Sequence, residues 1–431
     1  MSLEFTLCLV TLFLLAGIGT PVAYAIIVAS LVYLFFGGQS IGIAGKTLMD
    51  GVYQSFILLA VPLFIVAANI MNAGTISDRL LRFCVGLVGR FKGGMGHVNV
   101  VASLIFSGMS GSAVADAAGI GKVIIDMMVK SGHYTRGYAA AITAASAVIG
   151  PIIPPSIPMV LYALVSNELI GYLFLGGIVP GLFLGAVLMG MNWFIAHRRG
   201  FGTEDPVPLK ELPALTVNAF PALLMPAILL YGIYGGVTTP TEAAAVAAFY
   251  ALILAAVFYR ALSLRAFYDI LVESARSSAA VGLVIGGALI LNFIVASENI
   301  PSMMASAMVD LKISPLAFLL SVNLLILLLG CVLDATTIIL VIIPLFIPTC
   351  RELGIDLVHF GVVAVVNCMV GLITPPYGIL LFVINAVTQI PLAEIIREVL
   401  PFLAVLVVAL LVLILVPDLV LFLPRMLGYQ G

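Results

Sequence analysis

The sequence predicts an all-α, polytopic membrane protein made of two inverted-topology repeats, each with a re-entrant helical hairpin and a broken transmembrane helix. Of the 431 residues, 63% are hydrophobic and only 9% are charged, whereas soluble domains carry about 25% charged residues. Several apolar runs reach the roughly 20 residues that a membrane-spanning helix needs. Similar Gly- and Pro-rich motifs also recur in the two halves of the chain.

Long apolar segments mark the full-length spans. A window of this length with few charges is typical of a transmembrane helix. The candidates cover approximately residues 5–37, 54–74, 138–165, 170–196, 214–236, 241–260, 277–297, 358–388 and 400–423.

Two further apolar stretches, 97–130 and 314–350, are interrupted by polar residues. Each divides into two apolar arms around a tip rich in Gly, Ser, Thr and Asp. An arm of about 13–16 residues reaches only about 20–24 Å as a helix, which is too short to cross a bilayer. We therefore expect two re-entrant hairpins, each entering and leaving the membrane on one side.

The basic residues support this topology. Clusters flank both feet of the 97–130 stretch, so the positive-inside rule places both feet in the cytoplasm. The feet of the 314–350 stretch fall on the opposite, outer side of the membrane. Lys122 is the weak point of the assignment, because its alternative position is within an arm of the 97–130 hairpin. The rule places four basic clusters in cytoplasmic loops and leaves four basic residues outside. The clusters are Arg79, Arg82, Arg90 and Lys92; Lys122, Lys130 and Arg136; Arg198, Arg199 and Lys210; and Arg260, Arg265 and Arg276, whereas Lys46, Lys312, Arg351 and Arg425 fall outside.

Gly- and Pro-containing motifs occur at matching positions in the two halves of the chain. "GPIIPPS" starts at Gly150 and "GLITPPY" at Gly371, 221 residues later, and Pro180 and Pro401 have the same separation. One extra helix, 214–236, separates the halves, so the repeats have opposite orientation. We expect repeat 1 over 1–200, a linking segment and helix over 201–237, and repeat 2 over 238–431. Inverted repeats with broken helices are typical of secondary transporters.

Consecutive prolines interrupt one span in each repeat, in "IGPIIPPSIP" (149–158) and "VGLITPPYG" (370–378). Proline lacks the backbone donor and clashes with the preceding turn, so we expect both helices to open there. Freed carbonyls and half-helix ends are suited to Na⁺ and to anionic groups; the alternative is a simple proline kink. The candidates for ion binding are Gly150, Gly371 and Thr374, and those for substrate binding or gating are Pro154, Pro155, Ser156, Pro375 and Pro376.

The hairpin tips carry the remaining candidates. "SGMSGSAVADAAG" (107–119) and "GCVLDATT" (330–337) place hydroxyls, glycines and one carboxylate each inside an apolar region. An ionisable residue within a membrane is a functional candidate, but the glycines can serve helix packing and the aspartates can serve as helix caps. The ion-binding candidates are Ser107, Ser110, Gly111, Ser112, Asp116, Gly330 and Asp334, and the substrate or gating candidates are Thr336 and Thr337.

Several other functions find no support in the sequence. "SIGIAGKT" (40–47) resembles a phosphate-binding loop, but Ser40 occupies the first glycine position and no soluble βα context surrounds it. We therefore expect no ATP, no organic cofactor and no transition metal, and energy supplied by an ion gradient or by other subunits. No nucleophile–base pair suggests an enzyme, and no basic face suggests nucleic acid.

Five segments resemble the large membrane subunit of the tripartite ATP-independent periplasmic transporters, the DctM-like permeases. They are "SGMSGSAVADAAGIG", "GYAAAITAASAVIGPIIPPSIPMVLYA", "TTPTEAAAVAAFYAL", "LDATTIILVIIPLFIP" and "GLITPPYGILLFV".

The resemblance implies sodium-coupled import of a small organic acid across the bacterial inner membrane by an elevator-type motion of a transport domain against a scaffold. It also implies a small four-helix membrane subunit (DctQ-like) and a periplasmic substrate-binding protein (DctP-like) as partners. By motif match, tip 107–112, Gly330 to Asp334, Gly150 to Ser156 and Gly371 to Tyr377 would form sodium sites, with Thr374 the strongest candidate in the second half. The alternatives are a self-sufficient ion-coupled anion symporter and a passive channel.

Overall fold

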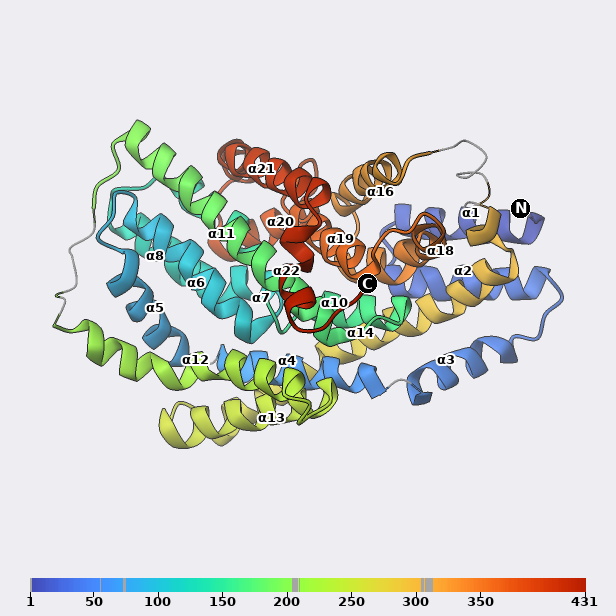
Figure 1. Ribbon diagram of the computed structural model, residues 1–431, viewed down its shortest axis with the longest axis horizontal. Coiled ribbons are helices and arrows are strands. Elements are labelled where there is room, and N and C mark those ends of the chain that lie inside the picture. Colours follow the sequence, from blue (N-terminus) through green and yellow to red (C-terminus); the bar gives the residue numbers. More distant parts are fainter. Residues whose placement is uncertain are drawn as a thin grey trace.

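The computed structural model describes residues 2–54, 56–72, 75–203, 208, 210–303, 306 and 313–431, and this part of the chain contains helices and no strand (Figure 1). Five of its helices are long and apolar enough to cross a membrane. They are α11 (Ile170–Arg199), α12 (Leu212–Tyr234), α13 (Pro240–Ile253) with its π-helical continuation Leu254–Phe258, α14 (Leu264–Ser297) and α21 (Leu392–Leu415). The chain is therefore a multi-pass membrane protein.

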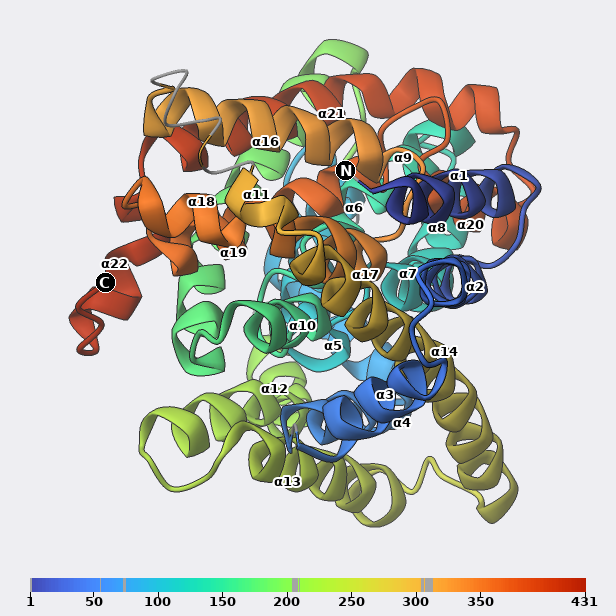
Figure 2. The ribbon, with the colours of Figure 1, turned by 90° about the vertical axis from the view of Figure 1, so that its right-hand side faces the viewer.

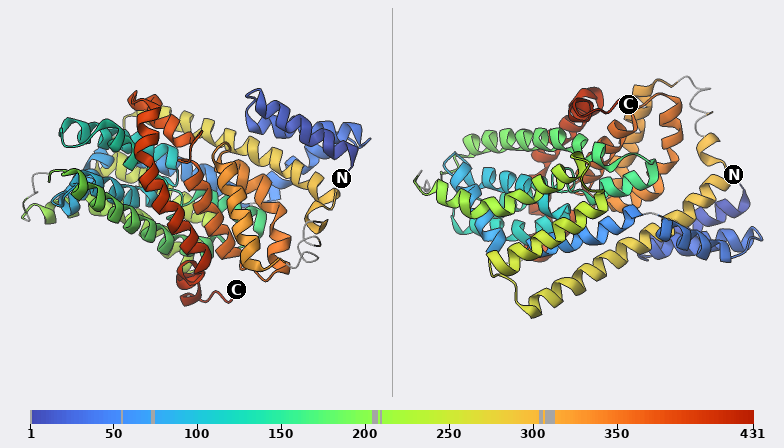
Figure 3. Two further views of the ribbon diagram at one scale, coloured as in Figure 1. Left: turned by 90° about the horizontal axis from the view of Figure 1, so that it is seen from above. Right: turned by 60° about the horizontal axis from the view of Figure 1, so that its bottom comes forward.

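One group of helices forms an outer layer. α14 runs along α2, α3 and α4, and α13 packs on α4 and α12 (Figures 1 and 3). The amphipathic helix α5 (Thr75–Val88) links this layer to the rest by contacting both α12 and α6. The other members are α1 (Leu3–Gly17), α2 (Val22–Phe36), α3 (Gly42–Gln54), the short turn η1 (Phe56–Leu59) and α4 (Ala60–Met71).

The second group contains the two hairpins, the two broken helices and three further helices. Hairpin 1 consists of α6 (Gly94–Ser110), α7 (Ala113–Asp116), η2 (Ala117–Gly121) and α8 (Lys122–Lys130). Hairpin 2 consists of α16 (Pro315–Gly330), α17 (Ala335–Thr337), η4 (Ile338–Ile342), η5 (Ile343–Leu345) and α18 (Ile347–Glu352). The broken helices are α9 (Arg136–Ala147) with α10 (Ile157–Ser166), and α19 (Leu357–Gly371) with α20 (Ile379–Thr388); α11, α21 and α22 (Asp418–Met426) complete the group.

The hairpins enter from opposite ends of the molecule, as the inverted repeats predict. Both feet of hairpin 1 contact the segment that follows α11: Gly93 N–H donates to Gly202 O at 3.3 Å, and the Tyr134 ring lies 5.0 Å from that of Phe201. At the other end, Arg351 in α18 of hairpin 2 donates to Ser166 O at 3.0 Å. Figure 1 shows α6 and α8 at one end and α16 and α18 toward the other, and Figure 2 places α7 and α17 near the centre.

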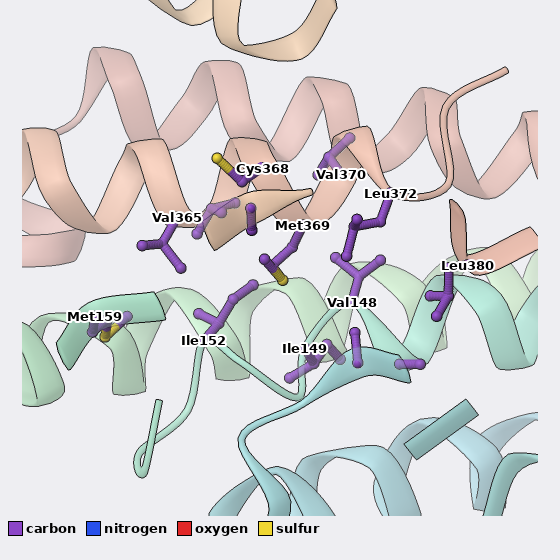
Figure 4. Close-up of a cluster of buried hydrophobic side chains, with 14 of the residues drawn as sticks. Val148, Ile149, Ile152, Met159, Val365, Cys368, Met369, Val370, Leu372 and Leu380 are labelled. Atoms are coloured by element: carbon purple, nitrogen blue, oxygen red, sulfur yellow. The ribbon is translucent and has the colours of Figure 1, made fainter. Parts of the chain in front are cut away.

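The two repeats interlock at their centre. α20 packs on hairpin 1 through α7 and η2, and α10 packs on hairpin 2 through α17 and η4. Buried apolar side chains fill the space between the two helix breaks, with Val148, Ile149 and Ile152 facing Met369 and Leu372 (Figure 4). The first break is therefore enclosed by protein, which is the condition under which irregular backbone is tolerated at membrane depth. The second break is only partly covered, because Pro376 and Tyr377 are exposed.

One polar cluster in each repeat joins the hairpin to the broken helix. In repeat 1, Asn99 Nδ2 donates to Thr143 Oγ1 at 2.6 Å, and Ser146 Oγ donates to Asn99 Oδ1 at 2.9 Å. In repeat 2, Asn367 Nδ2 donates to Asn323 O at 2.6 Å and to Asn323 Oδ1 at 2.9 Å. Hydrogen bonds of this kind join helices where water is absent.

Four sequence-based expectations need correction. The 5–37 segment is not one span but the pair α1 and α2, because Gly19 adopts φ +84° and Pro21 starts a new helix. The expected span 277–297 belongs to α14, which starts at Leu264 and carries Arg265 and Arg276 on a helix instead of in a loop. The expected 400–423 span starts earlier, at Leu392, and is interrupted between α21 and α22.

Lys122 requires the fourth correction, since it begins α8 within hairpin 1 instead of lying in a loop. The expected 54–74 span is described over 56–72 and there comprises η1 and α4. Lys312 lies outside the described residues.

Gly361 of α19 holds the two repeats in contact, so its replacement by alanine should destabilise the protein. A Cβ at this position would lie 2.2 Å from Cε1 of the buried Tyr162 ring, whose hydroxyl donates to Leu357 O at 2.7 Å. Overpacking of this kind costs about 1–3 kcal/mol, so Gly361→Ala should lower the unfolding temperature in detergent. Gly282→Ala on α14 is the matched control, because a Cβ there meets nothing within 4 Å; an equal loss in both variants would contradict the packing argument.

Candidate functional site

A cavity of about 440 Å³ lies where the two hairpin tips meet. Its walls include Ser110 to Ala115 from hairpin 1 and Asp334 to Thr336 from hairpin 2. Pro151, in the first helix break, and Leu372, at the start of the second, also contribute. Asn69 of α4 and Glu273 and Ser277 of α14 form the wall on the outer-layer side. The cavity therefore joins both repeats and the outer layer at one place.

The tip of hairpin 1 is shaped by Gly111 and Ser112. Gly111 has φ +59°, a left-handed conformation that favours glycine, and a Cβ there would lie 2.4 Å from Pro155 O. The tip backbone therefore touches the first helix break directly. Ser112 is the N-cap of α7 and its Oγ accepts from Ala115 N–H at 3.3 Å. Ser107 lies behind the tip, buried, with its Oγ donating to Leu104 O at 2.6 Å.

Asp116 is buried beneath this tip, with 1% of its surface exposed. Its Oδ1 accepts a short hydrogen bond from Ser110 Oγ, whereas no donor contacts its Oδ2. Gly150 lies against that free oxygen, since a Cβ on Gly150 would be 2.6 Å from it. Burying a polar oxygen without a partner is costly, so a cation or proton is the expected complement. Asp116 is not the cap of the returning arm, because Ser112 has that position.

The first helix break runs from the end of α9 to Ser156. Ser156 is the N-cap of α10, accepting from Met159 N–H at 3.2 Å, and it donates a short hydrogen bond to Pro151 O. This closes a compact loop containing Pro154 and Pro155, whose joining peptide bond is cis. The first residues of α10, Ile157 and Pro158, line the cavity. An N-terminal helix end, which carries partial positive charge, therefore borders the cavity.

The carboxylate in the tip of hairpin 2 caps a helix and, unlike that of Asp116, has a hydrogen-bond donor on each oxygen. Asp334 is the N-cap of α17, where Oδ2 accepts from Thr337 N–H at 3.1 Å and Oδ1 accepts from Thr337 Oγ1 at 2.5 Å. The capping alternative therefore applies to Asp334. Thr336 lines the cavity, whereas Thr337 is buried beside Asp334.

Two glycines bring hairpin 2 onto the second break. A Cβ on Gly371 would lie 2.7 Å from Gly330 Cα, so the two backbones are in contact. Gly378 N–H donates to Cys331 O at 3.2 Å and fixes the same junction. Thr374 lies beside the break, but its Oγ1 donates back to Val370 O at 2.8 Å. Pro375 and Pro376 follow, also joined by a cis peptide bond, and Ile379 at the start of α20 reaches the cavity.

The structure thus divides the candidate residues into two sets. Those in the cavity wall are Ser110, Gly111, Ser112, Asp334 and Thr336. The others lie in the tips and breaks but do not line the cavity: Ser107, Asp116, Gly150, Pro154, Pro155, Ser156, Gly330, Thr337, Gly371, Thr374, Pro375 and the exposed Pro376. Among the described residues, no group of three or more His, Cys, Asp or Glu side chains converges as a metal site.

Sequence reasoning missed the residues on the outer-layer side of the cavity. Glu273 and Ser277 are four residues apart on α14 and share one face, but the charges around them had suggested a loop before residue 277. Asn69 Nδ2 donates to Ser274 Oγ at 2.9 Å and joins α4 to α14. An asparagine within the apolar run "IVAANIM" was the available signal for this contact.

Comparisons with known proteins agree over most of the chain. Residues 9–419 match the family described as the tripartite ATP-independent periplasmic transporter, DctM component. The sialic acid TRAP transporter large permease protein SiaM of Vibrio cholerae is 41% identical over 95% of this chain and 96% of its own length. The C4-dicarboxylate large permease protein DctM of Pseudomonas aeruginosa is 39% identical over 87% of this chain and 88% of its own.

A third relative is longer than this chain. The sialic acid TRAP transporter permease protein SiaT of Haemophilus influenzae is 37% identical over 95% of this chain, which covers 66% of that protein.

Two solved structures share the fold. The Alcanivorax borkumensis YdaH transporter superposes with a TM-score of 0.65 at 16% identity, covering 96% of this chain and 98% of its own. Neisseria gonorrhoeae MtrF, described as illuminating a class of antimetabolite efflux pumps, has a TM-score of 0.59 at 12% identity. The superposition covers 96% of this chain and 95% of MtrF. At these identities the likeness concerns the fold.

Substitution of Gly371 by alanine should separate hairpin 2 from the second helix break. Because the new Cβ would lie 2.7 Å from Gly330 Cα, the backbones must move apart and the hydrogen bond from Gly378 to Cys331 should weaken. Hydrogen exchange at the Gly378 amide should therefore become faster in Gly371→Ala. Gly119→Ala, at a position in hairpin 1 with nothing within 4 Å, should leave this amide unchanged. Unaltered exchange in Gly371→Ala would show that the contact does not hold the tip.

Proposed function

The chain belongs to the DctM component family of tripartite ATP-independent periplasmic transporters, and from that premise we propose that it is the large permease subunit of a sodium-coupled importer of a small organic acid. As a member of this family it is a transporter permease and not an enzyme. The observation that carries the proposal is the central cavity, because both hairpin tips and both helix breaks contribute to it. Sites at the repeat interface are typical of secondary transporters.

Asp116 is the basis for sodium as the coupling ion. Its Oδ2 is buried and has no hydrogen-bond donor, and it lies against Gly150 at the helix break. Oxygen ligands, both carboxylate and backbone carbonyl, suit a small hard cation, and half-helix C-termini add negative potential. Ser110, bonded to the same carboxylate, adds a hydroxyl oxygen at the cavity wall. In the second half, Gly330, Gly371, Asp334 and Thr374 are the proposed counterparts.

The substrate class follows from the electrostatics of the cavity and from the relatives. α10 and α20 both begin at its wall, and helix N-termini attract anionic groups. Hydroxyls of Ser112 and Thr336 are available beside them. The volume of about 440 Å³ falls in the range of about 300–1,000 Å³ of small-molecule sites. Relatives named for sialic acid and C4-dicarboxylates both take carboxylates, which supports a small organic acid.

Partners and mechanism complete the proposal. We expect the bacterial inner membrane as location, a DctQ-like small membrane subunit, and a DctP-like periplasmic protein that delivers the acid. The longer SiaT permease, of which this chain covers 66%, is consistent with a fused small subunit in that relative. For the elevator motion, the outer layer of α1–α4 and α12–α14 would be the scaffold, and the hairpins with the broken helices would move. Gly108 of hairpin 1 meets Pro226 of α12 at this boundary.

Sodium should stabilise the purified permease in a saturable and selective manner. A ligand that binds only the folded state at about a hundred times its dissociation constant adds about 2.7 kcal/mol. We expect the unfolding temperature of the complex with its small subunit to rise with Na⁺ but not with K⁺ or choline at equal ionic strength. Asp116→Asn, Ser110→Ala and Thr374→Ala should each weaken this rise.

Asp126→Asn is the matched control, because Asp126 is exposed on α8 of the same hairpin. This variant should leave the sodium response unchanged. Equal stabilisation by Na⁺ and K⁺ would contradict sodium coupling and would favour proton coupling through Asp116.

Uptake by the reconstituted protein should need its partners. In proteoliposomes containing the permease and small subunit, an inward Na⁺ gradient should drive uptake of a labelled organic acid only when the binding protein is present outside. Asp116→Asn should reduce the rate at least about tenfold, which corresponds to about 1.4 kcal/mol. Gradient-driven uptake without the binding protein would instead establish the self-sufficient symporter, and flux without sodium coupling would indicate a channel.

A further inference from the structure

A second cavity lies at the end of the molecule where hairpin 1 has its feet, between α5, α8 and the start of α12. Its volume is about 500 Å³, and a smaller cavity of about 350 Å³ shares Asp78, Arg82 and Leu215 with it. Neither cavity touches the tips or the helix breaks. This site is therefore separate from the one proposed for transport.

Four charged side chains line these two cavities. Asp78, Arg79 and Arg82 lie within about one turn of α5, and Glu211 is the residue before α12. The Arg79 guanidinium lies 4.7 Å from the centre of the Tyr259 ring, which positions it. In the part of the chain that the structure describes, Asp78, Arg82 and Glu211 form no ion pair within 4.0 Å. Two positive and two negative groups therefore line two adjoining cavities, and none of the described pairs among them is a direct ion pair.

An apolar wall continues from the charged end. Val123 and Met127 are four residues apart on α8 and are 42% and 37% exposed. Val85 of α5 and Leu215 of α12 extend this surface. Gly86 lets the two helices approach, since a Cβ there would lie 3.1 Å from Leu215 Cδ1. This apolar wall is suited to a hydrocarbon chain.

The position of the cavity matches the edge of a bilayer. α5 buries Ile76, Leu80 and Cys84 and exposes its charges, as an interfacial helix does. The adjacent end of α11 carries the half-exposed Trp193 and then three basic residues, His197 to Arg199. Tryptophan followed by basic residues is typical of the cytoplasmic membrane boundary.

We propose that this cavity binds a phospholipid whose headgroup combines a phosphate with a primary ammonium group, the chemistry of phosphatidylethanolamine. Arg79 and Arg82 would hold the phosphate, because guanidinium groups bind phosphate with charge-assisted hydrogen bonds. Asp78 and Glu211 would accept hydrogen bonds from the ammonium group. One acyl chain would lie along Val123, Met127 and Leu215.

The balance of charges selects this headgroup. An anionic headgroup such as glycerol phosphate would meet the two carboxylates with nothing to neutralise them. A choline headgroup carries no N–H donor, so it offers the carboxylates only a diffuse charge. Since the cavity joins α8 of hairpin 1 to α12 of the outer layer, the lipid would bridge two parts of the fold.

Native mass spectrometry of the delipidated complex of this chain with its small subunit tests the proposal. The complex would be titrated with phosphatidylethanolamine, phosphatidylcholine and phosphatidylglycerol of identical acyl chains. We expect phosphatidylethanolamine to bind at least about fivefold more tightly than either of the others. Arg82→Gln and Glu211→Gln should each abolish this preference. Equal binding of the three lipids, or a preference for phosphatidylglycerol, would overturn the proposal.

Two controls keep the result interpretable. Arg90→Gln and Glu352→Gln change exposed residues outside the cavity and should leave the preference intact. Arg82→Lys keeps the charge but loses the planar pair of donors, so it should bind phosphatidylethanolamine more weakly than the unmodified chain and more tightly than Arg82→Gln. If Arg82→Gln retains full selectivity while its unfolding temperature is unchanged, the site lies elsewhere.

Discussion

The fold depends on how the polar backbone of two interrupted helices is kept away from lipid. Each break exposes peptide groups that a continuous helix would satisfy, and hydrocarbon offers them no partner. The protein packs each break against its own hairpin and the opposite repeat, with Gly111 against Pro155 and Gly330 against Gly371, and only Pro376 and Tyr377 of the second break remain exposed. The apolar cluster around Ile152 and Met369 excludes lipid from the space between the breaks. The interlocking of the repeats follows from this requirement.

Much of this arrangement could be predicted from the sequence because its causes are local. Consecutive prolines prevent a helix wherever they occur, and a short arm cannot span a bilayer, so the breaks and hairpins follow from single segments. The use of the two aspartates could not be predicted in this way. Asp334 is a cap and Asp116 is not because Ser112 already occupies the capping position, and this depends on the exact turn at which each tip ends. Glu273 was missed because a charged residue two turns inside a long helix is indistinguishable from a loop residue without knowing its neighbours.

The two cavities assign different chemistry to different parts of the fold. The central one is walled by hydroxyls, backbone and helix ends, which suit a small solute that must be released again. The peripheral one has full charges on an amphipathic helix and an exposed apolar wall, which suit a phospholipid at the membrane boundary. α5 belongs to the second and contacts both α6 and α12. The proposed lipid site and the proposed solute site thus lie at different parts of hairpin 1, the first near its feet and the second at its tip.

The unequal use of the two aspartates has an electrical consequence. Asp116, in its ionised form with one cation beside it, contributes no net charge to the assembly of hairpins and broken helices, whereas without the cation it contributes one negative charge. Displacement of a full charge through a membrane potential involves about 2.3 kcal/mol per 100 mV. If that assembly moves across the bilayer, membrane voltage acts on the Asp116 charge in the empty protein, whereas the bound cation cancels this one charge in the loaded protein. Asp116 would then make the return step of the empty protein sensitive to voltage.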